Sequence, residues 1–484
     1  MKRQLNCFVR QKSKMKLLFA SAEIYPYAKT GGLADVAQAL PRALSTEIDV
    51  LSVMPLYNFI DRKKFHITSL HQPFRLRLSH ETYFVSLYHG FNQGVETLFV
   101  YEPKLCAKKS PYGDEKGDYS DNDLRFGLFS KAIVMLAQIY SIDILHLNDW
   151  HTALAALWAR EMAPELRTIF TIHNLAFQGI FPKTSMQRLG LGEDYFHSES
   201  MEYWGQINCM KAGIAYSDFI TTVSPRYAIE ILQPHFGCGL DGFLKAHQSK
   251  LYGILNGIDT QLFDPEHDPL LVANYSKDSL GDKRLNKHLL CQEQKLEHEE
   301  WALLIFIGRF TQQKGIDLII QALPELLEMK LNLSIIGEGD LKIAKTLGAV
   351  AKKHNNFSIF FGYKESLSHQ SYAAADFLLM PSSFEPCGLN QLISLRYGTM
   401  PIVHRVGGIY NTIRNLDDKD SNICGQGIMM KSFDSDALIN AVKRALLHYQ
   451  SSEYFENTTK NNMQCDVSFL KSAESYLERY RSVL

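Results

Sequence analysis

The chain has 484 residues, more than one ordinary hydrophobic core accommodates, so two domains are expected. Apolar residues make up 46% of the chain and charged residues 21%, which is typical of a soluble globular enzyme. The formal net charge of -1 excludes a general attraction to nucleic acid or acidic membranes, although a local patch could still bind phosphate.

The first fourteen residues are basic and polar, and they lack the long apolar stretch of a secretion signal. We expect residues 1–14 to be a loose N-terminal extension; an alternative start site or a targeting segment would also fit. No apolar run is long enough to span a bilayer. Eight cysteines are scattered without a CxxC pair or a metal-ligand spacing, which favours a reduced, cytoplasmic compartment.

The first half of the chain alternates short apolar runs, typical of buried strands, with longer helical segments. Strands are predicted at 16–22, 50–54, 144–147, 168–172 and 220–223, with strand-like character at 70–88 and 97–101. Helices are predicted at 33–44 and 124–140. Between residues 57 and 123 the pattern is looser.

The second half repeats this alternation after a charged, mostly helical bridge at 277–300. Strands are predicted at 303–307, 333–336, 357–361, 377–380, 401–403 and 427–430, and helices at 318–327, 341–353 and 435–447. Such alternation predicts an α/β protein with two parallel sheets, each covered by helices on both faces. The expected division is 1–14, 15–265, 266–300 (the bridge), 301–465 and 466–484.

The most informative motif is the segment 383–391, with the sequence SFEPCGLNQ, which lies between a predicted strand and a predicted helix. Ligands of open α/β sheets bind beyond the carboxyl ends of the strands. Gly388 lets a ligand approach the backbone, and the first amides of the helix point at it. Amide donors beside the carboxylate acceptor of Glu385 suit a neutral polyhydroxyl ligand, so the motif predicts a sugar site.

Two cations follow the first strand of the second half, in the segment GRFTQQKG at 308–315. Arg309 can grip a phosphate in two-pronged fashion, and Lys314 adds a point charge next to the start of a helix. Such a site could neutralise a diphosphate leaving group without a metal. The alternative is that one or both cations are ordinary surface residues.

A glycine turn with a lysine, at Lys29 to Gly32, follows the first strand of the chain. Its glycines allow a close approach, but a plain tight turn explains the segment equally well. Asn256-Gly257 has the same ambiguity, because this dipeptide most often marks a simple turn.

Two further strand ends carry polar residues. Asp149 and His151 flank Trp150, whose ring could stack on a sugar. Alternatively, Trp150 belongs to the core and Asp149 caps the next helix. His173 ends the strand at 168–172, where a lone histidine is more often structural.

In their order and spacing, these motifs resemble those of bacterial glycogen synthases and plant starch synthases, from about Met15 to near the C-terminus. The matching segments are 29–36, 119–122 with 125–126, 146 with 149–151, 171–174 with 177–179, 211–213, 221–225, 255–259, 309–315 and 385–391. Any one of them could arise elsewhere, but together they are highly specific.

The resemblance implies a glycosyltransferase of the GT-B type, in which two Rossmann-like domains with parallel sheets face a central cleft. In that family the C-terminal domain holds most of the nucleotide sugar, the N-terminal domain holds the acceptor, and the last helix, 472–483 here, returns to the N-terminal domain. The implied reaction is the retaining transfer of glucose from ADP-glucose to the non-reducing end of an α-1,4-glucan, in cytoplasmic glycogen biosynthesis. No cofactor, metal, nucleic acid or membrane partner is implied.

The resemblance also implies residue roles, which amount to positioning and electrostatic stabilisation. The implied catalytic residues are Glu385, Arg309, Lys314 and His173. The two cations would stabilise the departing diphosphate, the carboxylate would hold the glucose hydroxyls, and the histidine would contact the transferred glucose. The implied substrate-binding residues are Lys29, Gly31, Gly32, Asp35, Asp149, Asn256, Cys387, Gly388 and Leu389.

Among the departures from the family pattern, one segment bears on the choice of donor. After Gly407-Gly408 the family usually continues with Leu, a small residue, Asp and Thr, whereas this chain has 409–412 as IYNT. This turn is expected near the nucleotide, so UDP-glucose stays open as the donor. A sucrose or trehalose-phosphate synthase is disfavoured by the segments 385–391 and 29–36. A glucan-binding protein with a degenerate fold is disfavoured because Arg309, Lys314 and Glu385 are all present.

Overall fold

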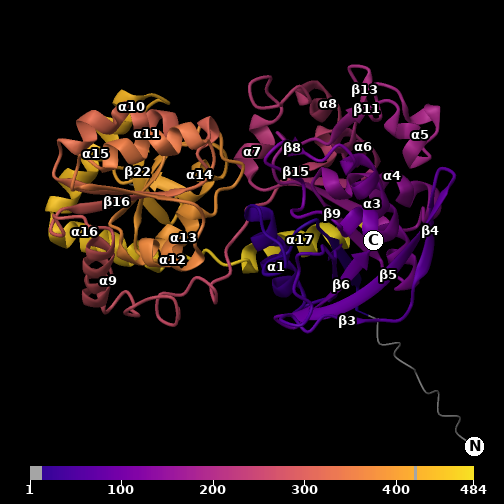
Figure 1. Cartoon of the computed structure of the whole chain (residues 1–484), viewed down its shortest axis with the longest axis horizontal. Coiled ribbons are helices and arrows are strands. Elements are labelled where there is room, and N and C mark those ends of the chain that lie inside the picture. The colour runs from indigo at the N-terminus through magenta and orange to yellow at the C-terminus, as the bar shows by residue number, and fades with distance from the viewer. Residues whose placement is uncertain (1–13, 419–421) are drawn as a thin grey trace, which may run out of the picture. The chain divides into compact units, whose positions relative to one another are not determined.

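The computed structural model describes residues 14–418 and 422–484, so the expected N-terminal extension lies outside the described residues, apart from Lys14. Residue contacts divide the chain into two compact units (Figure 1). The first unit comprises the chain up to Thr171 together with Phe177–Ile220 and Tyr476–Leu484; the second comprises Ile172–Ala176 and Thr221–Ser475. Each unit is an α/β structure built on a largely parallel sheet.

The sheet of the first unit is parallel in its centre and extended on one side by antiparallel strands. Its order is β15-β14-β10-β9-β1-β2-β6-β5-β3, with β4 paired to β5; the edge strand β15 (Leu251–Gly253) falls among the residues of the second unit. The strands are β1 (Lys16–Ala20), β2 (Asp49–Pro55), β3 (Thr68–Ser69), β4 (Phe74–Leu78), β5 (Glu81–Asn92), β6 (Val95–Tyr101), β9 (Ile144–Asn148), β10 (Arg167–Ile172) and β14 (Phe219–Thr222). Strand β9 is buried along its whole length, as expected where helices cover both faces of a parallel sheet.

The helices of this unit fill the connections between the parallel strands. The main ones are α1 (Gly32–Leu44), α3 (Asn122–Ile139), α4 (Trp150–Met162) and α6 (Cys209–Tyr216); α2 (Pro103–Cys106), α5 (Ser185–Leu189) and η1 (Glu193–Tyr195) are short. Two small antiparallel sheets are formed by β7 (Gly113–Asp114) with β8 (Gly117–Asp118), and by β11 (Ile180–Pro182), β13 (Gln206–Asn208) and β12 (Glu202–Tyr203).

The last helix of the chain completes the core of the first unit. Helix α17 (Leu470–Val483), drawn in yellow, ends among the purple elements of this unit (Figure 1). The buried Tyr480 hydroxyl lies 2.7 Å from Nδ1 of His146, whose Nε2 lies 2.6 Å from the Thr171 hydroxyl. Tyr476 packs on the same imidazole, with the ring centroids 5.2 Å apart. A buried histidine with both nitrogens hydrogen-bonded is a structural residue, and one of its partners, Tyr480, is 334 residues away in the sequence.

The sheet of the second unit is parallel throughout, in the order β18-β17-β16-β19-β20-β22-β21. Its strands are β16 (Ala302–Ile307), β17 (Leu331–Gly337), β18 (Phe357–Phe361), β19 (Phe377–Met380), β20 (Met400–His404), β21 (Ile413–Asn415) and β22 (Gly425–Met430). The unit also contains β15 (Leu251–Gly253), η2 (Gln248–Lys250) and η3 (Gln312–Lys314). Its helices are α7 (Pro225–Glu230), α8 (Asp241–Ala246), α9 (Leu280–Glu293), α10 (Ile316–Leu327), α11 (Leu341–Ala351), α12 (Glu365–Ala374), α13 (Asn390–Arg396), α14 (Gly407–Thr412), α15 (Ser435–Gln450) and α16 (Ser452–Met463).

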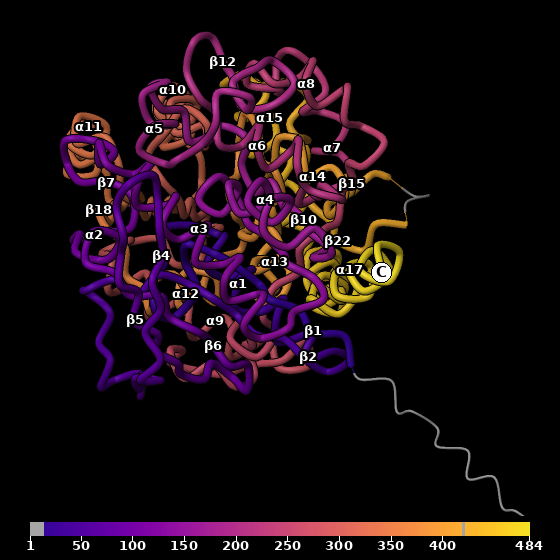
Figure 2. The backbone as a smooth tube through the Cα atoms, turned by 90° about the vertical axis from the view of Figure 1, so that its right-hand side faces the viewer, coloured from indigo at the N-terminus to yellow at the C-terminus, as the bar shows by residue number. Residues whose placement is uncertain are grey.

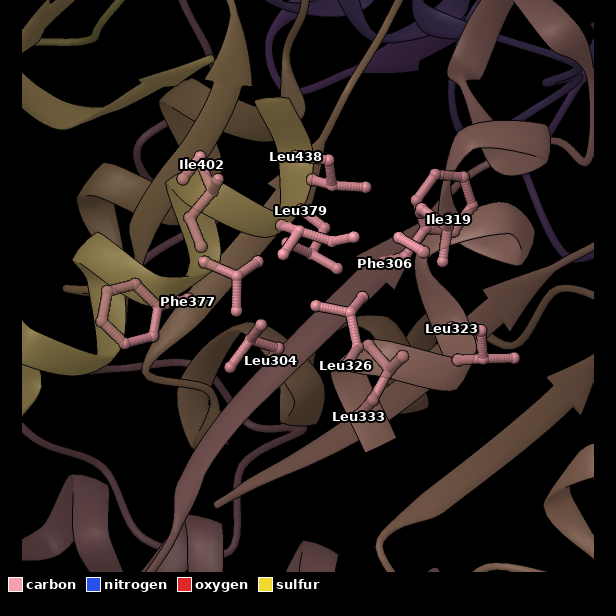
Figure 3. Packing of buried hydrophobic residues seen from close by; sticks show 14 of the residues in the cluster. Leu304, Phe306, Ile319, Leu323, Leu326, Leu333, Phe377, Leu379, Ile402 and Leu438 are labelled. Atoms are coloured by element: carbon pink, nitrogen blue, oxygen red, sulfur yellow. The ribbon is translucent and has the colours of Figure 1, made fainter. Parts of the chain in front are cut away.

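One face of this sheet packs against α10 and α15 (Figure 3). Alternate residues of β16, Leu304 and Phe306, point to this face, as the twofold period of a strand requires. Helix α10 presents Ile319, Leu323 and Leu326, which are spaced on one side of the helix. The packed core fixes the carboxyl ends of β16 and β19, where the segments 308–315 and 383–391 begin.

The expectation that the cysteines are reduced is wrong for one pair. Cys424, just before β22, is disulfide-bonded to Cys465, after α16. The two are 41 residues apart in the sequence, so only the fold, which brings α16 against β22, places them together. None of the described helices combines the length and apolar character needed to cross a membrane.

Candidate active site

The loop after β1 is organised by Glu23, a buried carboxylate. It accepts hydrogen bonds from the Thr30 amide (2.5 Å), the Thr30 hydroxyl (2.7 Å) and the Tyr112 hydroxyl (2.7 Å). Burial raises the pKa of Glu23, and these hydrogen bonds oppose the shift. These hydrogen bonds hold the loop on its inner side, where it faces Glu23 and Tyr112. On its outer side, a Cβ atom at Gly31 would meet nothing within 4 Å, so a ligand has access to this backbone.

The lysine of this loop is held by a short ion pair. Lys29 Nζ lies 2.7 Å from Oδ1 of Asp35, on the first turn of α1, which begins at Gly32. Asp35 was expected to bind substrate. In the structure its carboxylate fixes the lysine at the start of the helix, where the helix dipole adds positive potential.

Asp149 has an unusual backbone conformation. It is buried, has φ +56°, and immediately precedes α4. Its side chain makes no capping hydrogen bond to this helix, so one part of the alternative interpretation is wrong. The other part, which places Trp150 in the core, agrees with the burial of its side chain. With ψ +178°, Asp149 lies in a region that is almost exclusive to glycine and costs other residues about 1–3 kcal/mol, and such strain concentrates at functional sites.

Aromatic rings pack around this residue. Tyr112, which binds Glu23, stacks on His151 with centroids 4.4 Å apart, and His151 contacts Trp150 at 4.2 Å. Burial, together with the positive charge of Arg125, lowers the pKa of His151, so its imidazole is neutral at pH 7. The glycine loop and the Asp149 turn are therefore joined by one rigid aromatic cluster.

In the second unit, the central feature is an ion pair between two of the predicted site residues. Lys314 Nζ lies 2.6 Å from Oε2 of Glu385, and the Ser382 hydroxyl donates to the same oxygen at 3.0 Å. The carboxylate is buried and the lysine is partly exposed. Pairing leaves Oε1 of Glu385 and part of the lysine ammonium for a ligand.

The turn containing Lys314 is anchored to the neighbouring strand end. Gly315 has φ +69°, and a Cβ atom there would lie 2.0 Å from the Pro381 carbonyl oxygen, so only glycine fits. The Ser383 amide donates to the Gln313 carbonyl at 2.9 Å. Arg309, at the start of this loop, is exposed, and it has no ion-pair partner among residues 14–418 and 422–484. The loop can therefore offer the guanidinium of Arg309 to an anionic group.

The sugar motif is packed against the next turn of the sheet by two glycines. At Gly407, which has φ +48°, a Cβ atom would lie 1.9 Å from the Glu385 carbonyl oxygen; at Gly408 it would lie 2.1 Å from that of Cys387. The Gly408 amide donates to the Glu385 carbonyl at 3.0 Å. The backbone at Gly407 and Gly408 thus packs directly on the backbone of residues 385–387, and this contact fixes the direction of the Glu385 carboxylate.

Replacing Gly407 by alanine should destabilise the protein by more than about 3 kcal/mol, because both the backbone clash and the positive φ are unfavourable. Thermal unfolding of the purified variant measures this loss. The matched control is Gly348→Ala in α11, where a Cβ atom meets nothing within 4 Å and alanine should stabilise the helix by about 0.5–1 kcal/mol. Equal melting temperatures for the two variants would contradict this account.

Gly388 and Cys387 complete the motif. Gly388 has φ +74°, and the Gln391 amide group donates to the carbonyl oxygens of Gly388 (2.9 Å) and Cys387 (3.0 Å). Leu389 directly precedes α13, whose first amides lie at this turn. Burial raises the pKa of the Cys387 thiol to about 12, although the amide of Asn256 hydrogen-bonds its sulfur. Cys387 is therefore a neutral packing residue rather than a nucleophile.

Asn256 lies beside this motif. Its side chain is buried, and its Oδ1 atom has no hydrogen-bond partner among the described residues. A buried acceptor without a partner is unusual, and it suits a site that a ligand donor completes.

His173 follows β10 and is half-buried. Loss of solvation lowers the pKa of its imidazole to about 3, so the ring is neutral at pH 7. It can donate or accept hydrogen bonds, but it adds no positive charge to its surroundings.

His173 should make the protein sensitive to acid. Between pH 6.5 and about 3 the unfolded chain binds a proton at this residue and the folded chain does not, so stability falls as the pH falls through this window. The variant His173→Gln should lose less stability than the wild type between pH 6.5 and 4 in urea unfolding. His71→Gln, at an exposed position, should follow the wild type; a His173→Gln curve parallel to the wild type would refute this assignment.

The segment that departs from the family pattern forms most of α14. Asn411 accepts the Arg226 amide at Oδ1 (3.0 Å), and the Tyr410 ring lies under the guanidinium groups of Arg226 (4.9 Å) and Arg405 (4.2 Å). The carboxylate of Glu230 accepts the Gly407 amide at 3.1 and 3.2 Å. The unusual residues therefore hold α14 to α7 in this chain.

The structure gathers the predicted residues into two groups, one in each unit. The second unit brings together Lys314, Glu385, Cys387, Gly388, Leu389 and Asn256. The first unit links the Lys29 loop to Asp149 through the aromatic cluster. Sequence analysis missed Glu23, Tyr112 and Glu230. It included Ser224 in the matching segment 221–225 but gave it no role; in the structure its hydroxyl donates to the Pro386 carbonyl at 2.7 Å, and the residue caps α7 directly before a proline.

Comparisons with known proteins agree with this architecture. Residues 16–246 match the family model described as starch synthase catalytic domain, and residues 291–462 match that of glycosyl transferases group 1. Glycogen synthase of Bacillus cereus (strain ATCC 10987) is 38% identical over 482 residues, covering 97% of this chain and 100% of the relative. Glycogen synthase of Aquifex aeolicus (strain VF5) is 39% identical over 473 residues, covering 97% and 99%.

Solved structures give the same result. The catalytic domain of starch synthase IV from Arabidopsis thaliana, bound to ADP and acarbose, superposes with a TM-score of 0.90 at 30% identity, covering 97% of this chain and 99% of that one. A sucrose-phosphate synthase from Thermosynechococcus elongatus shares the fold alone, with a TM-score of 0.61 at 16% identity. Fold and sequence thus define a glycosyltransferase with two Rossmann-like domains of the GT-B type. The chain belongs to the glycogen synthase family, which is the resemblance that its motifs predicted.

Proposed function

We propose that this chain transfers glucose from ADP-glucose to the non-reducing end of an α-1,4-glucan, with retention of configuration at the anomeric carbon. The observation that carries the proposal is the Lys314–Glu385 pair, held by rigid backbone contacts at the start of α13. It places a cation for a diphosphate next to a carboxylate for sugar hydroxyls, at the ends of the neighbouring strands β16 and β19. The ADP named with the Arabidopsis structure supports an adenine nucleotide as donor.

Arg309 and Lys314 would act on the leaving group. As the bond between the anomeric carbon and the diphosphate oxygen lengthens, negative charge gathers on the diphosphate, and both cations stabilise it more than they stabilise the bound donor. The carboxylate of Glu385 fixes Lys314 and accepts hydrogen bonds from glucose hydroxyls. This division of labour needs no covalent intermediate on the protein.

The remaining predicted residues would complete the sugar and acceptor sites. A neutral His173 can contact the transferred glucose without adding positive charge where the anomeric carbon becomes electron-poor. Asn256 would accept a hydrogen bond from a substrate hydroxyl at its unpartnered Oδ1. In the first unit, the amides at Gly31 and Gly32, with Lys29 and Asp149, would bind polar groups of the substrates.

The division into residues 15–265, 266–300, 301–465 and 466–484 remains our proposal for the domains, with the acceptor assigned to the first and the nucleotide sugar to the third. We also infer that the enzyme works in the cytoplasm, where bacterial relatives of this family would meet their donor. Disulfides are rare in the cytoplasm, and Cys424 and Cys465 form one in the structure. Counting the free thiols of the protein as it occurs in intact cells is therefore a direct test of this compartment.

The test is incorporation of labelled glucose into glycogen, with ADP-glucose and UDP-glucose assayed in parallel. We expect incorporation, with the higher kcat/KM for ADP-glucose. A higher kcat/KM for UDP-glucose would correct the donor alone. No incorporation from either donor by folded protein that still binds glycogen would refute the enzymatic proposal and favour a binding protein.

A further inference from the structure

A tryptophan stands exposed at the tip of the β12–β13 hairpin. Trp204 and Gly205 form the two-residue loop between the paired residues Tyr203 and Gln206. The Trp204 side chain is 86% exposed, more than any other large apolar side chain that the structure describes. In Figure 1 and, from the side, in Figure 2, this hairpin lies at the upper edge of the first unit.

The hairpin loop is also a poor place for this residue. Trp204 has φ +51° and Gly205 has φ +78°, and a two-residue loop with both residues at positive φ is a type I′ turn. Such turns favour asparagine followed by glycine, whereas a bulky side chain there is strained. Trp204 therefore contributes neither burial nor turn propensity to the fold, which points to a role outside it.

Polar groups surround the exposed ring. The Glu202 carboxylate reaches the tip, where its Oε1 accepts the Gly205 amide at 2.8 Å, and the Gln206 side chain is exposed beside it. An aromatic face next to acceptors and an amide suits a ligand with apolar C–H faces and hydroxyl edges. A sugar chain has this chemistry.

The hairpin is rigidly attached to the predicted acceptor side of the first unit. Strand β13 pairs with β11, placing Phe181 opposite Ile207. The Phe181 ring packs on Trp150, with centroids 5.6 Å apart, and Trp150 directly follows Asp149. A glucan chain bound at the tip would therefore be tethered to the same structural block as the Asp149 turn.

We propose that Trp204 is the stacking platform of an outer binding site for the α-1,4-glucan acceptor. This outer site would hold long glucan chains on the enzyme. This inference rests on the proposed function for the identity of the ligand. The outer site raises the effective concentration of chain ends, so it acts on long glucans and not on acceptors too short to reach it.

The test compares the wild type with Trp204→Asn, which restores the Asn-Gly sequence that the turn prefers, so the variant should fold at least as stably. Binding of glycogen without donor is measured by retardation in glycogen-containing native gels. Transfer is measured with glycogen and with maltotriose. We expect about 3- to 10-fold weaker glycogen binding and a similar rise in KM for glycogen, from the loss of one aromatic contact, with unchanged kinetics on maltotriose.

Two further variants sharpen the result. Trp204→Tyr should recover most of the glycogen affinity, and Phe91→Asn, at another exposed aromatic of the first unit, should behave as the wild type. Unchanged glycogen binding in Trp204→Asn, or equal losses on glycogen and maltotriose, would overturn the proposal. So would a change in sedimentation that shows Trp204 to be a contact between copies. A wild type that binds glycogen but transfers no glucose would refute the proposed reaction and leave the binding site standing.

Discussion

Glu385→Gln should lower kcat/KM for glucose transfer by about 10³-fold, because glutamine keeps the shape of the side chain but loses its charge. In the native structure that charge holds Lys314 at 2.6 Å and accepts the Ser382 hydroxyl. Without it, the lysine is no longer fixed toward the diphosphate, and the strongest acceptor for glucose hydroxyls is lost. Labelled-glucose incorporation measures the rate, and circular dichroism with thermal unfolding verifies that the variant is folded.

The matched control is an ion pair of the same length on the surface of the same unit. Glu325 on α10 lies 2.7 Å from Lys443 on α15, and both side chains are 51% exposed. Glu325→Gln should leave kcat/KM within about twofold of the wild type and stability within about 0.5 kcal/mol. Near-normal turnover by Glu385→Gln would exclude this residue from the site, whatever its place in the fold.

Arg309→Ala should lower kcat/KM for the nucleotide sugar by about 10²- to 10³-fold, since a guanidinium that stabilises a leaving diphosphate acts mainly in the transition state. Inhibition by the product ADP should weaken in parallel, because ADP carries the same diphosphate. Arg309→Lys should recover only part of the loss, since an ammonium group cannot make the two-pronged contact. Initial rates and ADP inhibition constants provide the measurement.

Arg284 on α9 is the control, because its side chain is 78% exposed and its nearest carboxylate partner, Glu456, is at 4.0 Å. Arg284→Ala should match the wild type in rate and in ADP inhibition. If Arg309→Ala kept its ADP inhibition constant, the diphosphate would not be bound by this loop, and the interpretation of the segment 308–315 would be wrong.

The strands of the second unit were predictable because parallel strands buried on both faces are continuous apolar runs. The predicted strands at 303–307 and 377–380 coincide with β16 and β19 within a residue or so. The strand-like region at 70–88 was harder to interpret. It is a hairpin formed by β4 and β5, and its turn includes Ser79 at φ +51°. Glycine or asparagine usually adopts this conformation, but the turn contains neither, so the sequence gives no turn signal there.

The candidate site was predicted where the chain is locally continuous, and missed where it is not. Glu385 and Gly388 lie in one segment, as do Arg309 and Lys314, so their motifs are visible in the sequence. Glu23 joins the glycine loop to Tyr112, which is 89 residues away, and nothing in the local sequence indicates that partner. Glu230 accepts a hydrogen bond from the Gly407 amide, which is 177 residues away in the sequence. The residues around Glu230 in α7 do not indicate this partner.

The core of the first unit is closed by the last residues of the chain. Tyr476 and Tyr480 are almost fully buried, and Tyr480 supplies the partner of His146 Nδ1. During synthesis on a ribosome, the sheet of this unit emerges first, whereas α17 emerges only after the second unit. The unit made first is therefore completed last, after the whole second unit has been translated. Until residues 476–480 have been translated, the nascent chain carries an uncovered aromatic patch, and His146 lacks the hydrogen-bond partner of its Nδ1 atom.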